Sequence, residues 1–558
     1  MADVAFAQPA WLKALGVYLE RRTLVMLALG FSAGLPFLLI FDTLSAWMRE
    51  SGLSLEVIGF FSLATMSYAF KFLWAPLIDR TTVPVLTALV GHRRAWMLVA
   101  QAAVTTGLVL IALSDPASNL GLVGVFAVLT GFSSATQDIV IDAWRIEATG
   151  ESEQGAMVAA YTWGYRIARI VAGAVPLILA QAYSWSISYG VMAAMMIIGV
   201  LAVLLAPRER AHVIRPIPDG GLRARPSAER AEWLARLSVL ALGALFLGSG
   251  LSGRADILAL ILPQGIGTAV KATWIAPGTG VWFQLLGVLA GILLIGLAAW
   301  PLPGKRTRPG IFLFHAFGEP LADFFGRYRG SAGLILAAIC LYRLADFTLN
   351  IMNPFYIDLG FSFTEIAAVR KGYGTVMAMI GVFAAGYAIA RWGLMRPLLV
   401  GAFAGPVSNL VFAWLATQGP DLAALTIAIS VDNVSEGFSG TCLIAYMSSL
   451  TAEGFTATQY ALFSSLYAIP GKLVGSQSGR IIEGAARSIE TGGIFAPAVK
   501  FFDGVPAATL IQSATKLGVA PAALGAGYLV FFVYTFVIGL SGVLLTYIVM
   551  RRQSARTP

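Results

Sequence analysis

Residues 70–94 read FKFLWAPLIDRTTVPVLTALVGHRR, an apolar stretch that ends in Asp79-Arg80 and is followed by a short connection to Gly91 and a basic cluster. Apolar residues begin before this stretch and resume after it. Blocks of about 20 apolar residues have the length that a helix needs to cross roughly 30 Å of hydrocarbon at 1.5 Å per residue. The stretch therefore predicts two transmembrane helices, over 55–77 and 96–114, joined by a short charged loop.

The same alternation of apolar blocks and polar loops continues along the chain. Of 558 residues, 58% are hydrophobic and 12% are charged, whereas soluble domains carry roughly 25% charged residues. The sequence thus predicts an all-α polytopic membrane protein with about 14 transmembrane helices. The predicted spans are 24–48, 55–77, 96–114, 120–143, 155–179, 186–206, 237–262, 281–303, 331–356, 363–390, 397–416, 422–447, 458–482 and 524–550.

The net charge of +9 is spread over short loops. An even number of spans places both termini on one side, and basic residues such as Arg93, Arg223 and Arg306 gather in the loops of that side. This pattern predicts a multi-pass protein with both termini in the cytoplasm. Nucleic acid is not an expected partner, because the basic residues form no single stripe. Cys340 and Cys442 fall within predicted spans, where a disulfide framework is not expected.

The chain contains an internal repeat, because the motif at 52–55 after the first span recurs at 360–363 after the ninth. Two six-helix halves follow, and the two spans between them have no counterpart, so they form an inserted pair. The predicted units are an N-terminal half (1–206), a cytoplasmic linker (207–236), an inserted transmembrane helix pair (237–303), a cytoplasmic loop (304–330) and a C-terminal half (331–558).

Within the C-terminal half, residues 485–523 are long for a loop and contain several prolines and glycines. We expect this segment on the periplasmic side. Because it has no counterpart in the first half and lies outside the charge-bearing spans, we expect it to be dispensable for transport.

Each half carries two carboxylates four residues apart on its fourth span, Asp138 with Asp142 and Asp432 with Glu436. Four residues make close to one helical turn, so each pair lies on one face. Two carboxylates this close in a low dielectric do not both ionise easily, and one is expected to hold a proton near neutral pH. The alternative for Asp142 is a fixed ion pair with Arg145.

Other intramembrane charges suggest an anionic ligand. Lys71, Arg166 and Lys371 could anchor carboxylates of a substrate, or each could instead be the structural partner of a nearby acid. All three histidines are predicted in cytoplasmic loops, which leaves carboxylates for proton coupling. The coupling candidates are Asp138, Asp142, Asp346, Asp432 and Glu436.

Asp79-Arg80 followed by Gly91-His92-Arg93-Arg94 resembles the signature of the loop after the second span in the major facilitator superfamily, and the charged first and fourth spans of each half fit that fold. In that superfamily the signature locks the cytoplasmic side by charge pairing with helix ends. The resemblance implies a conformational latch, whose candidate residues are Asp79, Arg80, Arg93, Arg94 and, from a weaker second copy, Arg391.

Several strings resemble the AmpG-type muropeptide permeases more specifically. They are Gly30-Phe-Ser-Ala-Gly-Leu-Pro36, Phe70-Lys-Phe-Leu-Trp74, Gln137-Asp138 with Asp142-Ala-Trp144, Gly164-Tyr165-Arg166, Tyr342 with Asp346, and Thr456-Ala-Thr-Gln459. The resemblance implies import of 1,6-anhydromuropeptides across the bacterial inner membrane for cell-wall recycling, driven by proton symport. The candidate substrate-binding residues are Lys71, Gln137, Tyr165, Arg166, Lys371 and Asn433.

Two alternatives stay open: a transporter of acetyl-coenzyme A or another anionic solute from the same superfamily, and a membrane sensor that transports nothing. An enzyme is not expected, because the chain has no His-Glu-x-x-His, Walker or Gly-x-Ser-x-Gly motif. No cofactor or metal is expected. The expected partners are the anionic glycopeptide or sugar substrate, protons and the lipid bilayer, and we expect a monomer.

Overall fold

The computed structural model describes residues 16–51, 67–116, 118–207, 222, 225–252, 254–276, 279–299, 307–347, 352–475, 478–506 and 509–554. All elements within these residues are helices, and they include no strand. The all-α class predicted from the sequence is confirmed.

The N-terminal half contains the first six predicted spans. The first span is interrupted by a π-helical turn a few residues after Pro36, and α9 and α10 form long uninterrupted helices. Its elements are η1 (Val17–Leu19), α2 (Arg21–Leu38), η2 (Leu39–Thr43), α3 (Leu44–Glu50), α5 (Ser67–Phe70), η4 (Lys71–Leu73), α6 (Ala75–Arg80), α7 (Leu86–Val90), α8 (His92–Ala112), α9 (Leu120–Ala148), α10 (Glu151–Ala182), α11 (Trp185–Met195) and α12 (Ile197–Leu205).

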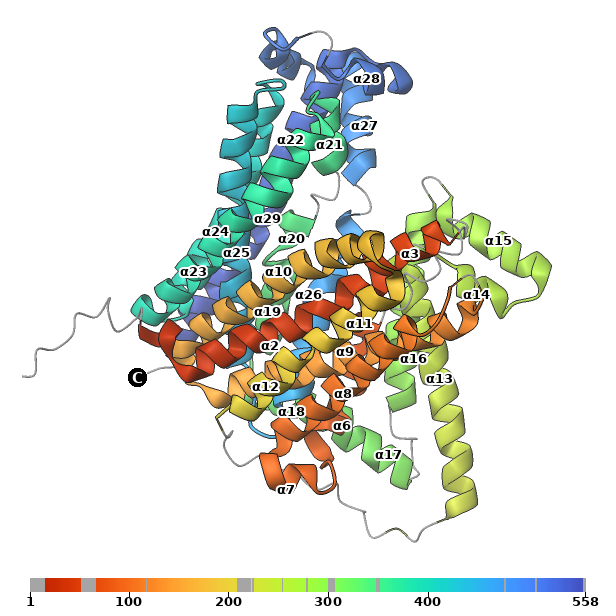
Figure 1. The fold of residues 1–558 in the computed structure, drawn as a ribbon. Helices are drawn as coiled ribbons and strands as arrows, with labels where there is room; N and C mark the ends of the chain where they lie inside the picture. Colours follow the sequence, from red (N-terminus) through yellow and green to blue (C-terminus); the bar gives the residue numbers. More distant parts are fainter. Residues whose placement is uncertain are drawn as a thin grey trace, which may run out of the picture.

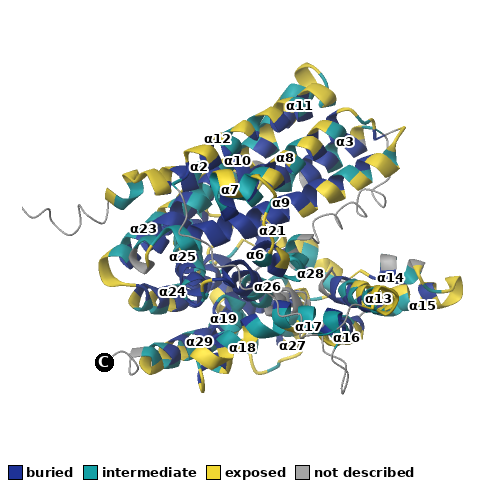
Figure 2. Ribbon diagram, turned by 90° about the horizontal axis from the view of Figure 1, so that it is seen from below, coloured by how far each residue is buried: buried dark blue, intermediate teal, exposed yellow. Residues whose placement is uncertain are grey.

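The insertion is a helical hairpin with two short helices at its turn. Its long helices pack closely, because Gly291 on one faces the backbone of Leu247 on the other. The elements here are α13 (Pro226–Ser252), α14 (Asp256–Leu260), α15 (Gln264–Ile275) and α16 (Gly280–Ala299), followed by α17 (Arg308–Leu313), η5 (Phe314–Gly318) and α18 (Glu319–Arg327). Figure 2 shows the hairpin beside the two halves, next to α17 and α18.

The start of α13 lies inside the stretch expected to be linker. Pro226 occupies its first position, where a missing N–H costs nothing, and Glu229 accepts a hydrogen bond from the backbone N–H of Arg225 at 2.9 Å. Because of these two residues, the helix begins before the apolar block, so the linker is shorter than 207–236.

The C-terminal half repeats the plan of the first with more interruptions. Its elements are α19 (Ala332–Leu341), α20 (Leu344–Phe347), α21 (Met352–Asp358), α22 (Phe363–Ile366), η7 (Ala367–Tyr373), α23 (Gly374–Trp392), α24 (Met395–Ala416), α25 (Leu422–Ser449), α26 (Thr456–Gly475), α27 (Ser478–Glu490), η8 (Ala496–Phe502), α28 (Ile511–Leu517) and α29 (Pro521–Ser554). Within the described part of the chain, eight helices are individually long and apolar enough to cross a membrane, and each matches a predicted span.

The two halves meet along α10 and α23 and along α26, which packs against α6 and α9. These contacts lie on the side of the molecule that holds η1, α18 and the last turn of α29, which we call the terminal side. From there the helices of the two halves diverge towards α3 and α28 (Figure 1). The molecule is therefore held together at one end of its helices.

Residues 485–523 form a folded cap at the far end of the C-terminal half. Phe502, Leu510 and Ala514 are buried in the same apolar cluster as α21, α25 and α29. Asp358 at the end of α21 accepts hydrogen bonds from the hydroxyls of Ser513 and Tyr528, both at 2.7 Å. Removing the cap would expose this core, whereas its dispensability for transport stays a prediction.

Candidate functional site

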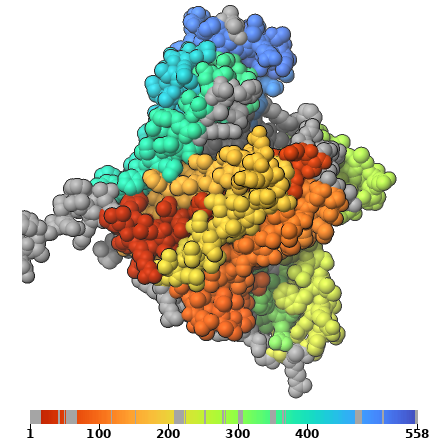
Figure 3. Space-filling model, in the orientation of Figure 1, coloured from red at the N-terminus to blue at the C-terminus, as the bar shows by residue number. Residues whose placement is uncertain are grey.

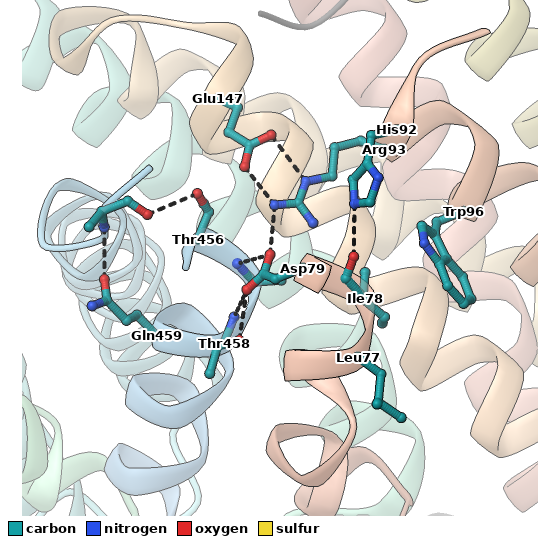
Figure 4. Close-up of polar contacts among 12 residues, drawn as sticks. Leu77, Ile78, Asp79, His92, Arg93, Trp96, Glu147, Thr456, Thr458 and Gln459 are labelled. Carbon is teal, nitrogen blue, oxygen red and sulfur yellow. Dashed lines mark hydrogen bonds and ion pairs between the residues drawn. The ribbon is translucent and has the colours of Figure 1, made fainter. Parts of the chain in front are cut away.

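Asp79, in the last turn of α6, ties the two halves together on the terminal side (Figure 4). Its carboxylate accepts hydrogen bonds from Arg93 at 2.7 Å and from α26, through the backbone N–H of Thr458 at 2.8 Å, its hydroxyl at 2.7 Å and the N–H of Ala457 at 3.3 Å. Arg93 also donates two hydrogen bonds to Glu147, at 2.7 and 3.0 Å. A carboxylate at the first turn of α26 satisfies unpaired N–H groups and faces the positive end of the helix dipole.

The other predicted latch residues are placed differently. Arg80 bridges α6 to the loop helices through Glu319 at 3.0 Å and the backbone carbonyl of His315. Arg94 donates to the carbonyls of Val203 and Leu204, so it holds the end of α12 within its own half. Arg391 is exposed at the end of α23 and contributes no contact to this cluster among the described residues.

A second group of contacts joins α9 and α10 to the C-terminal half. Arg145 is fully buried and donates to the hydroxyl of Ser448 at 3.1 Å, while its guanidinium lies over the ring of Tyr460 at 5.3 Å. The indole N–H of Trp163 donates to the carbonyl of Met379 at 3.0 Å. Both residues therefore fasten the N-terminal half to the other half.

Asp138 and Asp142 are both buried on α9, but their partners differ. Asp142 lies 3.3 Å from Arg145 and 3.7 Å from the ammonium of Lys71. Asp138 interacts electrostatically with Lys71 and Asp142 without an ion pair to any described residue, and its Oδ1 atom is buried without a hydrogen bond from them. Asp142 is thus the charge-paired member, and Asp138 is compensated only at longer range.

Tyrosine hydroxyls surround Asp138. Tyr161 donates a hydrogen bond to its carboxylate, and Tyr165 lies close enough to interact with its charge. Both tyrosines project from α10, which approaches α2 closely because Gly30 and Gly34 face the backbone at those two positions. The close packing of α2 and α10 therefore positions hydroxyl groups beside the buried acid.

Gln137, the neighbour of Asp138, is directed elsewhere. It is fully buried and donates to the hydroxyl of Ser32 on α2 at 2.8 Å. Its contact is with a helix of its own half.

The carboxylates of the C-terminal half are not equivalent to those of the first. Glu436 pairs with Arg343 at 3.4 Å, and Arg166 of the N-terminal half interacts electrostatically with both. Asp432 accepts a hydrogen bond from Ser408 on α24 at 3.3 Å. Glu436 therefore lies between Arg343 of its own half and Arg166 of the other half.

The remaining predicted residues add little to this cluster. Asn433 donates to the carbonyl of Ile429 on its own helix at 3.0 Å. Asp346 lies on α20 and Lys371 on η7, and their side chains fall outside the described part of the structure. The sequence did not identify Glu147, Thr458 or Arg343 as site residues, because each gains its role from a partner on another helix.

Comparison with known proteins shows what the chain resembles. The model of the Major Facilitator Superfamily matches residues 23–270. The anhydromuropeptide permease of Escherichia coli K12 is 29% identical over 472 residues, covering 84% of this chain and 76% of that protein. The chain is thus similar to an AmpG-type permease over most of its length.

Two further comparisons are more distant. A Rickettsia conorii protein named "Putative transporter AmpG 4" is 25% identical over 84% of this chain and 91% of its own length. Among solved structures, the proton:xylose symporter XylE aligns over 94% of each chain at 11% identity with a TM-score of 0.47, a likeness too distant to carry an argument. The architecture is the major facilitator fold, with a helical hairpin between its halves.

Proposed function

We propose that the protein imports 1,6-anhydromuropeptides from the periplasm to the cytosol by proton symport, as a step in peptidoglycan recycling. The observation that carries the proposal is the meeting of charges from both halves, where Arg166 of the first half lies with Arg343 and Glu436 of the second. An anionic glycopeptide could bridge arginines of both halves through its carboxylates. The relatives named as anhydromuropeptide permease and AmpG 4 support this class of substrate.

Proton coupling is assigned to Asp138, which is buried, surrounded by hydroxyls and less tightly paired than Asp142. An acid with these surroundings can lose and regain a proton when the halves move, because α26 of the other half packs against α9 and η4 beside it, and its departure changes the solvation of the acid. The orientation that goes with the proposal has the terminal side in the cytoplasm, as the basic loops predict.

The test is uptake of labelled N-acetylglucosaminyl-anhydro-N-acetylmuramic acid into proteoliposomes. We expect accumulation when the outside is acidic, and equilibration alone when a protonophore collapses the gradient. Acetyl-coenzyme A in excess should not compete. Competition by acetyl-coenzyme A without competition by the unlabelled disaccharide would replace this proposal with the coenzyme transporter.

A further inference from the structure

An apolar cavity of about 210 Å³ lies where α2, α10 and α23 meet on the terminal side. Its walls include Leu24 and Leu27 from α2, Ala160 and Trp163 from α10, and Phe383 from α23. In Figure 3 this seam is where the red atoms of the first helix adjoin those of the C-terminal half. None of the transport steps described above uses this cavity.

The polar atoms around the cavity are already bonded. Tyr18 donates through its hydroxyl to the carbonyl of Phe383 at 2.9 Å, Thr23 donates to the carbonyl of Val17 at 2.7 Å, and Trp163 donates to Met379. A sugar or peptide would find no partner there. Apolar cavities of roughly 150 Å³ already exclude water and accept hydrocarbon molecules, so this one suits a stretch of hydrocarbon chain.

One wall of the cavity is exposed. Leu24 is 51% exposed and is the first residue of the first predicted span, so we expect lipid next to it. One turn earlier on α2, Arg21 and Arg22 are exposed at the helix end. Arg21 donates a hydrogen bond to the carbonyl of Leu205, and Arg22 donates to that of Ala148 and lies 3.6 Å from Glu153. The Arg22 side chain is still 44% exposed in this arrangement. Arginines at this level attract phosphate headgroups, and a phospholipid held there could direct one chain towards Leu24.

The cavity exists only while the halves are closed on this side, because its walls come from both. The ring of Tyr18 packs on that of Phe383 at 4.6 Å between centroids, and its hydroxyl lies against Gly386. Separating α10 from α23 would remove one wall. A lipid chain in this position contacts both halves in the closed state and loses contacts when they separate, so it favours the closed state.

We propose that one acyl chain of a membrane phospholipid occupies this cavity, with its phosphate near Arg21 and Arg22, and stabilises the state closed on the terminal side. The proposal does not depend on the identity of the transported substrate. It assigns a lipid site to the seam between α10 and α23. This site shares no residue with the Asp138 group or with the Asp79 contact.

The test uses the full-length protein in liposomes that contain a phospholipid with a diazirine in one acyl chain. After illumination, cross-linked positions are mapped by mass spectrometry, with the exposed Leu289 and Leu293 of α16 as the internal reference for bulk lipid. We expect cross-links in 23–27 and 159–163. Two variants fill the cavity: Leu24→Trp, at an exposed position that tolerates a larger ring, and Ala160→Phe. Each should lower the cross-linking yield at these positions about tenfold relative to α16, as expected if about two methylenes of the lipid chain are excluded from the cavity.

Unchanged yields in both variants, or a wild type labelled on α16 but not at the cavity, would overturn the proposal. A rise in cavity labelling only after deletion of residues 2–15 would show that the chain's own N-terminal segment is the occupant. Asp79→Asn, which weakens closure on this side, should lower the yield as well. If it leaves the yield unchanged, the link between the lipid and the closed state is wrong.

Discussion

Asp138 and Asp142 lie one helical turn apart, yet only Asp142 has cations within 4 Å among the described residues. A coupling acid made permanently neutral resembles the protonated state, so the transporter can still bind and exchange substrate. It cannot use the gradient. We therefore expect Asp138→Asn to retain substrate counterflow in proteoliposomes and to lose accumulation driven by a proton gradient.

Asp142→Asn serves as the matched comparison. Removing one member of a buried ion pair leaves Lys71 and Arg145 uncompensated, at a cost of about 3–5 kcal/mol. We expect this variant to lose counterflow and accumulation together, with a lower melting temperature. Opposite results for the two variants would exchange their roles, and accumulation in both would move the coupling site to Glu436 or Asp432.

Arg343 offers a separate test of substrate binding. Its pairing with Glu436 and its proximity to Arg166 place a cation where both halves can reach one ligand. A hydrogen bond to a charged group contributes about 1.5–3 kcal/mol, so Arg343→Gln should raise KM roughly 10- to 100-fold. Lys516→Gln on the exposed α28 is the control, and an equal effect of both substitutions would remove Arg343 from the site.

Among the elements, the cap formed by η8 and α28 provides a sharp contrast between adjacent side chains. Phe502 is 5% exposed and packs against Gly525, whereas Phe501 is 66% exposed. Truncating a buried phenylalanine costs about 3–5 kcal/mol. We expect Phe502→Ala to lower the thermal unfolding midpoint in detergent clearly and Phe501→Ala to leave it nearly unchanged. Equal midpoints would show that the cap does not contribute to the stability of this half.

The helices and the carboxylate pairs were predictable because their signals are local in sequence. Apolar blocks report helices, and Asp138 with Asp142 follows from spacing on one helix. The cap was not predictable, because Phe502 and Leu510 are scattered among prolines and glycines with no helical period. Nor were the partners of Asp79, since Thr458 becomes its neighbour only when the two halves pack together.

At the scale of the molecule, the hydrogen bonds between the two halves that can be assigned in the described residues lie on the terminal side. They include Asp79 with Thr458, Arg145 with Ser448 and Tyr18 with Phe383. The helices diverge from these contacts (Figure 1). Alternating access requires a transporter to break one such set while forming another, so these bonds set the free energy of opening on this side.

A substitution of Asp79 tests whether these bonds set the free energy of opening. Asp79 contacts α26 and does not belong to the charge group of Arg166 and Arg343. Asp79→Asn keeps the shape and removes the charge that faces Arg93 and the helix end, so the closed state loses stability relative to the open one. We expect slower turnover with substrate affinity unchanged, measured as kcat and as the Kd for the labelled disaccharide. Thr458→Val removes one hydroxyl donor and leaves the backbone N–H, so its effect should be in the same direction and smaller. A large fall in affinity at constant turnover would mean that Asp79 contributes to binding, and that closing and binding are not separate functions of this fold.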